Sequence, residues 1–404
     1  MTIIIAILFI FINAVLTFFT VYHFSFFLLY LVYSSFFSSR KVDPIFHYHH
    51  RFCIIVPAHN EAKIINRLID SLDLLQYPKN KYEVLIIADN CTDDTAQIAI
   101  DRGINCLIRN DLTRIGKPYA LNWALKQLRI GDFDAFTIID ADTAIHPDYL
   151  SHMDLKLLKG DHAIQGYFDI MNPGDTWFTH LMVIPGVLKF HTRYFIKDKI
   201  GLSCPLMGNG MTFSRSVIEG FGWNAFSITE NWEYYVQLLL KGYNVGFSSD
   251  AKIFSHAVSK LSHGETQRKR WIRGRLGVFK NYLVPILFEA KKNRSLILYD
   301  ALFELASLSY SMLFSFTILT FIIAFILHNY IIIPAAIYFW CTAVLLLQLI
   351  FFFSGLFISK SPLKVWLKLP YLPVFLLWKV YISVKSLFNF KKLTWEKTDR
   401  KSVT

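Results

Sequence analysis

Residues 52–61 read FCIIVPAHNE, and this stretch decides the fold. The apolar run at 52–56 predicts a buried strand, and polar residues begin where that strand ends. Apolar residues then recur at positions 64, 65, 68, 69 and 72, a spacing typical of one face of a helix. Residues 83–88, EVLIIA, predict a second strand. The segment therefore has the order strand, helix, strand.

The same alternation continues to residue 139. A helix is expected from Asp93, and the runs INCLI at 104–108 and AFTII at 135–139 predict two more strands. Strands that alternate with helices predict a parallel sheet covered by helices. Because ligands of such sheets bind beyond the carboxyl ends of the strands, we expect the functional site at that edge.

The two ends of the chain have a different composition from its middle. Of the 404 residues 54% are apolar, and these gather before Arg40 and after Leu305. Residues 2–37 contain no Asp, Glu, Lys or Arg and predict one long or tilted membrane span, with two tight spans as the alternative. Residues 305–359 are equally free of charge and predict two membrane helices. Residues 363–390 contain lysines and prolines, which favours an interfacial segment.

The sequence thus predicts five parts. They are an N-terminal transmembrane segment (1–40), a catalytic domain (50–280), an interfacial segment (281–304), two transmembrane helices (305–359), and an interfacial helix with a basic tail (360–404).

The net charge of +12 fits a membrane protein. Arg40, Lys41 and Arg51 follow the first span, so the positive-inside rule predicts a multi-pass protein of the plasma membrane with a cytoplasmic domain. No nucleic-acid motif accompanies the charge, and nucleic acid is not expected as a partner, whereas membrane lipid is. The five cysteines are scattered and form no CxxC pair, which argues against a structural zinc site or a disulfide framework.

Carboxylates follow three of the predicted strands. Glu61 comes after the first and Asp89 ends the second, while Asp140 and Asp142 form a DAD triplet after the strand at 135–139. Mg²⁺ and Mn²⁺ prefer such oxygen ligands, and a metal held there neutralises a departing nucleotide diphosphate. The alternative for DAD is a solvated turn, but its place behind an apolar strand favours the metal.

Four other segments carry candidate site residues. Lys117 precedes a helical pattern and pairs with phosphate there, or is a plain surface lysine. Gly208 and Gly210 in CPLMGNGMTFS allow close approach of a ligand, or a tight turn. Glu230 opens a helix, as a functional acid or as a cap. Residues 267–271, QRKRW, offer arginines for a diphosphate and a tryptophan for a sugar ring, or form a juxtamembrane basic helix.

Taken in order, these segments resemble the family 2 inverting glycosyltransferases, in the membrane branch that includes cellulose, chitin and hyaluronan synthases. The series is VPAHNE, IIADNCTDDTA, GKPYALNWAL, IIDADT, GNGMTFSR, ITENWE and QRKRW, from about residue 52 to 275. The resemblance implies an α/β GT-A domain inserted between N-terminal and C-terminal transmembrane helices. It also implies a UDP-sugar donor and a hexosyltransferase that depends on Mg²⁺ or Mn²⁺.

The resemblance further implies a role for each matching residue. The residues near the nucleotide sugar would be Ala58, Glu61, Asp89, Lys117, Asp140, Gln267 and Arg270. The acceptor would lie beside Gly208, Asn209, Gly210 and Trp271. Asp140 and Asp142 would hold the metal, and Glu230, Asn231 and Asp142 would make up the catalytic set.

One position departs from the family. Its members usually have Thr-Glu-Asp, whose aspartate is the general base, and this chain has Asn231 in that place. An amide does not accept a proton at neutral pH. Glu230 is therefore the first candidate for the base, and Glu233, one turn later on the same helix, is in reserve.

These features predict transfer of a sugar from a UDP-sugar to a growing polysaccharide or glycan at the membrane, with polysaccharide-export proteins as partners. A first alternative is transfer to a membrane lipid, as in ceramide glucosyltransferase-like relatives, which the small number of predicted spans favours. A second is an inactive membrane scaffold or transporter. Asn231 favours that alternative, and the intact Asp140, Asp142 and Arg270 oppose it.

Overall fold

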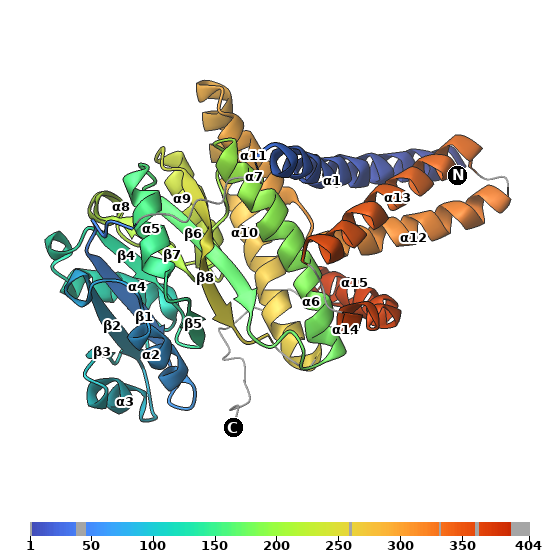
Figure 1. The fold of residues 1–404 in the computed structure, drawn as a ribbon. Coiled ribbons are helices and arrows are strands. Elements are labelled where there is room, and N and C mark those ends of the chain that lie inside the picture. Colours follow the sequence, from blue (N-terminus) through green and yellow to red (C-terminus); the bar gives the residue numbers. More distant parts are fainter. Residues whose placement is uncertain (1, 38–45, 258–260, 331–332, 360–362, 389–404) are drawn as a thin grey trace.

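The computed structural model describes residues 2–37, 46–257, 261–330, 333–359 and 363–388. An α/β domain forms one end of the molecule, and a group of long apolar helices extends from it (Figure 1). Arg40 and Lys41, on which the predicted orientation depends, and the basic tail from Lys391 lie outside the described residues.

One mixed sheet of eight strands, in the order β3-β2-β1-β4-β7-β6-β8-β5, forms the centre of the domain. The strands are β1 (Phe52–Ala58), β2 (Tyr82–Asp89), β3 (Asn105–Arg109), β4 (Ala135–Ile138), β5 (Thr143–Ile145), β6 (Ala163–Ile170), β7 (Met211–Ser214) and β8 (Val245–Ser255). The four strands predicted from the sequence are β1 to β4, and they pair in parallel, as expected.

The other half of the sheet lies outside the four predicted strands and is mixed, with β6 and β8 parallel to each other. β7 runs antiparallel to both β4 and β6, and β5 runs antiparallel to β8. The reason is where β7 begins. Its first residue pairs with Ile138, the last residue of β4, so β7 starts at the carboxyl edge and has to run back along β4.

Helices cover both faces of this sheet. In the domain these are α2 (Ile65–Asp73), α3 (Thr95–Asp101), α4 (Lys117–Gln127), α5 (Tyr149–Leu158), α8 (Arg215–Phe221) and α9 (Glu230–Leu240), with short 3-10 turns η1 (Lys79–Lys81) and η2 (Ile130–Asp132). Successive residues of β1 face opposite sides, so Ile54 and Val56 pack with α2 and α5 while Cys53 and Ile55 pack with α4. The helical spacing predicted for 64–72 is confirmed, because four of its five positions are buried on α2.

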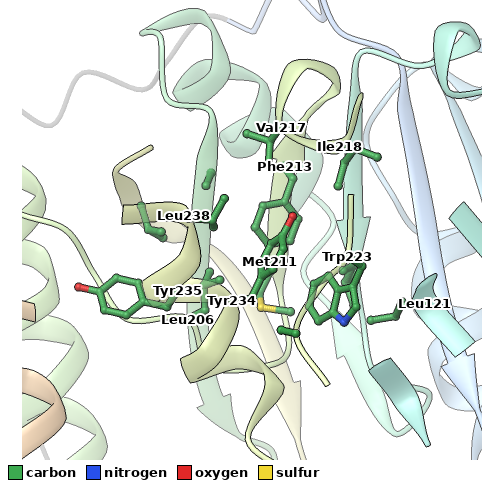
Figure 2. Packing of buried hydrophobic residues seen from close by; sticks show 14 of the residues in the cluster. Leu121, Leu206, Met211, Phe213, Val217, Ile218, Trp223, Tyr234, Tyr235 and Leu238 are labelled. Atoms are coloured by element: carbon green, nitrogen blue, oxygen red, sulfur yellow. The ribbon is translucent and has the colours of Figure 1, made fainter. Parts of the chain in front are cut away.

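An aromatic cluster fixes α9 against the sheet (Figure 2). The rings of Trp223 and Tyr234 are stacked with centroids 4.4 Å apart, and Phe213 of β7 meets Tyr234 edge to face at 5.2 Å. Leu121 of α4 and Met211 of β7 are buried in the same cluster. Because Tyr234 lies one turn after Glu230, this packing sets where the first turn of α9 stands.

Four helical segments are long and apolar enough to cross a membrane: Ala6–Phe37, Tyr310–Asn329, Ala335–Ile358 and Leu363–Ser386. They belong to α1 (Thr2–Phe37), α12 (Tyr310–Asn329), α13 (Ala335–Ile358), α14 (Leu363–Trp366), the turn η4 (Leu369–Tyr371) and α15 (Leu372–Phe388). α1 is one continuous helix of 36 residues, not two. The last segment qualifies as a span by length and composition, so its interfacial placement stays a prediction.

Two helical stretches connect the apolar helices to the domain. The first is α6 (Trp177–Val187), the π-helical turn η3 (Leu188–Tyr194) and α7 (Phe195–Lys199), and the second is α10 (Leu261–Asn293) with α11 (Leu296–Ala306). Both lie between the sheet and the apolar helices in Figure 1. The boundary predicted at residue 280 falls inside α10, and residues from Val278 to Leu305 bury side chains in the core of the domain.

Candidate functional site

The DAD triplet lies beyond the carboxyl end of β4, at the edge where a ligand was expected. The Asp140 carboxylate is 39% exposed, and the backbone N–H of Asp140 donates to Oδ1 of Asn209 at 3.0 Å. Oδ1 of Asp142 accepts a hydrogen bond from Thr143, the first residue of β5. The triplet is thus held at both ends by the sheet.

The donor set at this edge fits a hard cation only in part. Within the described residues no group of three or more His, Cys, Asp or Glu side chains is placed to hold a metal. Two aspartate side chains, Asp140 and Asp142, suit Mg²⁺ or Mn²⁺ when phosphate oxygens and water supply the other ligands, which is the usual arrangement for Mg²⁺.

Lys117 is part of the site rather than a surface lysine. It is the first residue of α4, its Nζ lies 2.5 Å from Oδ1 of Asp140, and it also donates to the carbonyl oxygen of Gly208. The ammonium group therefore joins the DAD triplet to the glycine loop.

The glycine loop, residues 208–210, needs its glycines for two reasons. Gly208 and Gly210 have φ of +88° and +64°, which favour glycine. A Cβ at Gly210 would also lie 2.7 Å from Cδ1 of Ile253. A Cβ on Gly208 would lie within 4 Å of both Glu230 and Asn231, so this loop forms one wall of the site beside the start of α9.

Asn209, which is predicted to lie beside the acceptor, is buried and supports the glycine loop. Its Nδ2 donates to Oγ1 of Thr143 at 2.7 Å while its Oδ1 accepts from Asp140. Gln165 of β6 holds the same loop, donating to the Asn209 carbonyl at 2.9 Å and accepting from the N–H of Met207 at 2.7 Å. Sequence reasoning missed Gln165, although a single amide in an apolar strand was a usable signal.

Glu230 and Arg270 complete the site. Burial raises the pKa of Glu230 above its usual range, while the charges of Lys117 and Arg270 oppose the rise. Burial lowers the pKa of Arg270, and the carboxylates of Glu230 and Asp140 oppose that effect. The structure therefore brings Lys117, Asp140, Gly208, Glu230 and Arg270 together from five separate segments.

Two polar neighbours of Glu230 on α9, Asn231 and Glu233, form hydrogen bonds of their own. Nδ2 of Asn231 donates to the carbonyl oxygen of Leu206 at 2.7 Å. Glu233, the reserve candidate for the base, accepts from the N–H of Ser227 at 2.7 Å and from the hydroxyl of Tyr282 at 3.3 Å. These contacts give Glu233 a structural function at the start of α9 and leave Glu230 as the carboxylate that faces the glycine loop.

The QRKRW segment forms the early part of α10, supported from behind by α15. The Arg273 Nε donates to the carbonyl oxygen of Ser386 at 2.8 Å, and the Arg268 guanidinium lies 5.1 Å from the ring centre of Trp378. Trp271 is 47% exposed, so its ring is open to a ligand. Gln267 is half-buried on the same helix.

The remaining predicted residues lie at the ends of β1 and β2. Ala58 is buried and pairs with Ala88, and the backbone N–H of Glu61 donates to Thr95. The Asp89 carboxylate forms a buried ion pair with Arg109 at 2.5 Å, so it helps to build this edge of the sheet. Burial raises the pKa of Asp89, and Arg109 opposes the rise.

The family described as Glycosyl transferase family group 2 matches residues 135–354, more than half of the chain. The probable glycosyltransferase YdaM of Bacillus subtilis is 22% identical over 377 residues, which are 86% of each chain. A beta-monoglucosyldiacylglycerol synthase of Synechocystis is 28% identical over 55% of this chain and 47% of its own length. The glucomannan 4-beta-mannosyltransferase 7 of Arabidopsis thaliana is 23% identical over 54% of this chain and 41% of its own.

Among solved structures, the mannosyltransferase PcManGT from Pyrobaculum calidifontis, in complex with GDP-Man and Mn²⁺, is similar in fold. The TM-score is 0.52 at 18% identity, over 94% of this chain and 99% of that one. The fold, apolar helices included, is therefore shared along nearly the whole length of both proteins. The chain spans less than half of the Synechocystis and Arabidopsis relatives.

Proposed function

Because this chain belongs to glycosyl transferase family group 2, we propose that it moves a sugar from a UDP-sugar to a hydroxyl of a membrane-borne acceptor, with inversion at the anomeric carbon. One observation supports this above the others. Lys117, Asp140, the Gly208 carbonyl, Glu230 and Arg270 meet at the carboxyl edge of the sheet, where a nucleotide-diphosphate sugar is bound in α/β folds.

Each residue then has a task. Arg270 and Lys117 bind the diphosphate and stabilise the negative charge that develops on it as the glycosidic bond breaks. Glu230 accepts the proton of the attacking hydroxyl, and its raised pKa makes it a stronger base than an exposed carboxylate. Asp140 and Asp142 would hold Mg²⁺ or Mn²⁺, which would supply further positive charge for the leaving group.

A lipid acceptor fits this chain better than a growing polysaccharide. The similar Synechocystis protein is named for a lipid product, and the similar Arabidopsis protein for a polysaccharide one. The described part of the chain offers four candidate spans, few for a polymer channel, and α10 and α11 connect the site directly to them. We therefore place the lipid first and glycan extension second.

The test is direct transfer by the purified full-length protein. It is incubated in lipid vesicles with labelled UDP-sugars and GDP-mannose, with and without diacylglycerol, and products are identified by mass spectrometry and NMR. We expect a glycolipid whose anomeric configuration is inverted relative to the donor. Absence of transfer from every donor, or retained configuration, would contradict the proposal.

The metal is tested in the same assay. EDTA and Asp142→Asn should each abolish transfer, and Mn²⁺ or Mg²⁺ should restore activity only after EDTA. Full activity in EDTA would remove the metal from the proposal while leaving transfer itself intact.

A further inference from the structure

Two cations near the acceptor side of the site have no carboxylate partner. Lys189 of η3 places its Nζ 2.7 Å from Sδ of Met207, a weak acceptor, and 5.0 and 5.1 Å from the ring centres of Phe190 and Tyr194. The Arg275 guanidinium of α10 lies 5.8 Å from the ring centre of Trp232. In the part of the chain that the structure describes, neither forms an ion pair, although both are largely shielded from solvent.

The nearest carboxylates are already engaged. Glu304 pairs with Nζ of Lys197 at 2.5 Å and with Nε of Arg193 at 3.3 Å. Asp300 pairs with Lys197 at 2.7 Å and accepts from the hydroxyl of Tyr22 at 2.8 Å. Two carboxylates thus serve Arg193 and Lys197, and in the described part of the chain neither Lys189 nor Arg275 has a carboxylate of its own.

The charge of Arg275 acts on Lys189, and both cations contact residues next to the segments that carry predicted acceptor residues. Burial lowers the pKa of Lys189 to about 7, the charges of Arg193 and Arg275 contribute to the shift, and the carboxylate of Glu304 opposes it. Met207 directly precedes Gly208, and Trp232 directly follows Asn231, so the two cations stand beside the wall and the helix that flank Glu230. Buried cations without a counter-ion are costly, which is the condition under which an anionic ligand binds well.

We propose that Lys189 and Arg275 bind a phosphate group that the acceptor carries close to the hydroxyl that receives the sugar. The proposal rests on the proposed function and adds a substrate class to it, an anionic phosphate-bearing acceptor in place of a neutral one. The position of Arg193 indicates that such an acceptor comes from the membrane. It lies one turn after Lys189, and its Nη1 is 2.7 Å from Nδ1 of His23 on the apolar helix α1, so the cations lie between the site and the helices that contact lipid.

The experiment compares acceptors that differ in the phosphate. Phosphatidylglycerol and diacylglycerol are offered in phosphatidylcholine vesicles, and glycerol 3-phosphate and glycerol are offered in solution. We expect phosphatidylglycerol to be preferred. Lys189→Gln and Arg275→Gln should each raise its KM by about tenfold, while the KM of diacylglycerol and of the donor stays unchanged. If glycerol 3-phosphate is as good an acceptor as phosphatidylglycerol, the phosphate site is supported and the acceptor is a soluble molecule.

One exposed lysine on α7, which directly follows η3, and one on α10 serve as matched controls. Lys199 of α7 and Lys280 of α10 are exposed, and Lys199→Gln and Lys280→Gln should change nothing. Equal losses with the anionic and neutral lipids, or no preference in the native protein, would overturn the phosphate site.

A binding measurement tests the phosphate site without requiring turnover. Native mass spectrometry of the detergent-solubilised protein should show more retained phosphatidylglycerol than phosphatidylcholine, and the double variant should lose that difference. Lack of transfer with selective lipid retention would contradict the proposed function alone. Equal retention of both lipids would contradict this inference alone.

Discussion

Glu230 and Asn231 are neighbours in sequence, and both side chains lie beside the glycine loop. Glu230 offers a carboxylate there, whereas Asn231 donates its amide proton to the Leu206 carbonyl. An aspartate at 231 would set a carboxylate against that carbonyl oxygen, and the two would repel. The amide is thus matched to its surroundings, and the substitution that departs from the family has a structural reason.

Replacing Glu230 by Gln should lower kcat by ~10²–10⁴-fold with little change in donor KM. The pH profile adds a second readout. A base works when deprotonated, and burial raises the pKa of Glu230, so activity should fall on the acid side at a pH above the ordinary carboxyl range. The acid limb of kcat/KM should disappear in Glu230→Gln. An unchanged limb would assign the base to another group.

Asn231→Asp should keep transfer within about tenfold of the native level and reduce stability by about 1–3 kcal/mol, because the hydrogen bond to Leu206 is lost. Asn231→Ala serves as the control, since it loses the bond without adding charge. An inactive native protein that Asn231→Asp switches on would instead support the inactive-scaffold alternative.

Motifs located the site residues better than they located their partners. Strand ends meet at one edge of a parallel sheet, so Asp89, Asp140 and the PAHNE stretch could be placed from local pattern alone. The contacts of Lys117 with Gly208, and of Gln165 with Asn209, join residues far apart in the chain. No local spacing encodes such pairs. The hydrogen bonds of Asn209 and Glu233 could not be predicted for the same reason.

At the scale of elements, α10 lies against the start of α9 because Gly274 has no side chain. A Cβ there would lie 2.2 Å from Cγ2 of Thr229, the residue before Glu230. The approach keeps Arg270, one turn earlier on α10, close to Glu230. The sequence predicted α9 and its end near Gly242, whereas the boundary predicted at residue 280 falls inside α10.

Gly274→Ala should push α10 away from α9 and lower kcat/KM at least about tenfold, mainly by displacing Arg270. Gly277 is the matched control on the same helix, since a Cβ there meets nothing within 4 Å. Gly277→Ala should retain activity and stabilise the helix by up to about 1 kcal/mol. Similar kinetics for the two variants would show that the contact at Gly274 does not position Arg270.

At the scale of the whole molecule, one buried charge network joins the membrane helix α1 to the catalytic domain. Tyr22 and His23 of α1, Arg193 and Lys197 of the α6–α7 stretch, and Asp300 and Glu304 of α11 take part. Burial opposes the ionisation of Glu304, but Arg193 and Lys197 prevail and lower its pKa below the usual range.

Glu304→Gln should destabilise the protein by about 3–5 kcal/mol, because buried cations lose their counter-ion. Glu289→Gln removes a surface pair with Lys292 and should cost ~0–1 kcal/mol. Thermal denaturation in detergent measures both. Since the pKa of Glu304 is lowered by folding, its contribution is present at neutral pH and is lost as the pH falls through the lowered value. Equal midpoints for the two variants would mean that the network adds no stability.

The proposed orientation places both the domain and the carboxyl-terminal tail in the cytoplasm. A single cysteine introduced as Ser402→Cys, with the half-buried Cys91 and Cys106 replaced by serine, should be labelled only after permeabilisation of cells. Labelling from outside, with the domain still protected, would mean that the segment Leu363–Ser386 crosses the bilayer and is not interfacial.

The length of α1 has a kinetic consequence. Its 36 residues make a rod of about 54 Å, longer than the hydrocarbon core of about 30 Å. Its last turns pack against the domain, because the rings of Tyr30 and Tyr33 both contact the ring of Phe195 of α7. Anchored by this helix, the enzyme would search for its proposed lipid acceptor by two-dimensional diffusion in the bilayer. Its velocity should follow the mole fraction of acceptor in the bilayer, and diluting that lipid with inert lipid should slow it even when the amount per millilitre is constant.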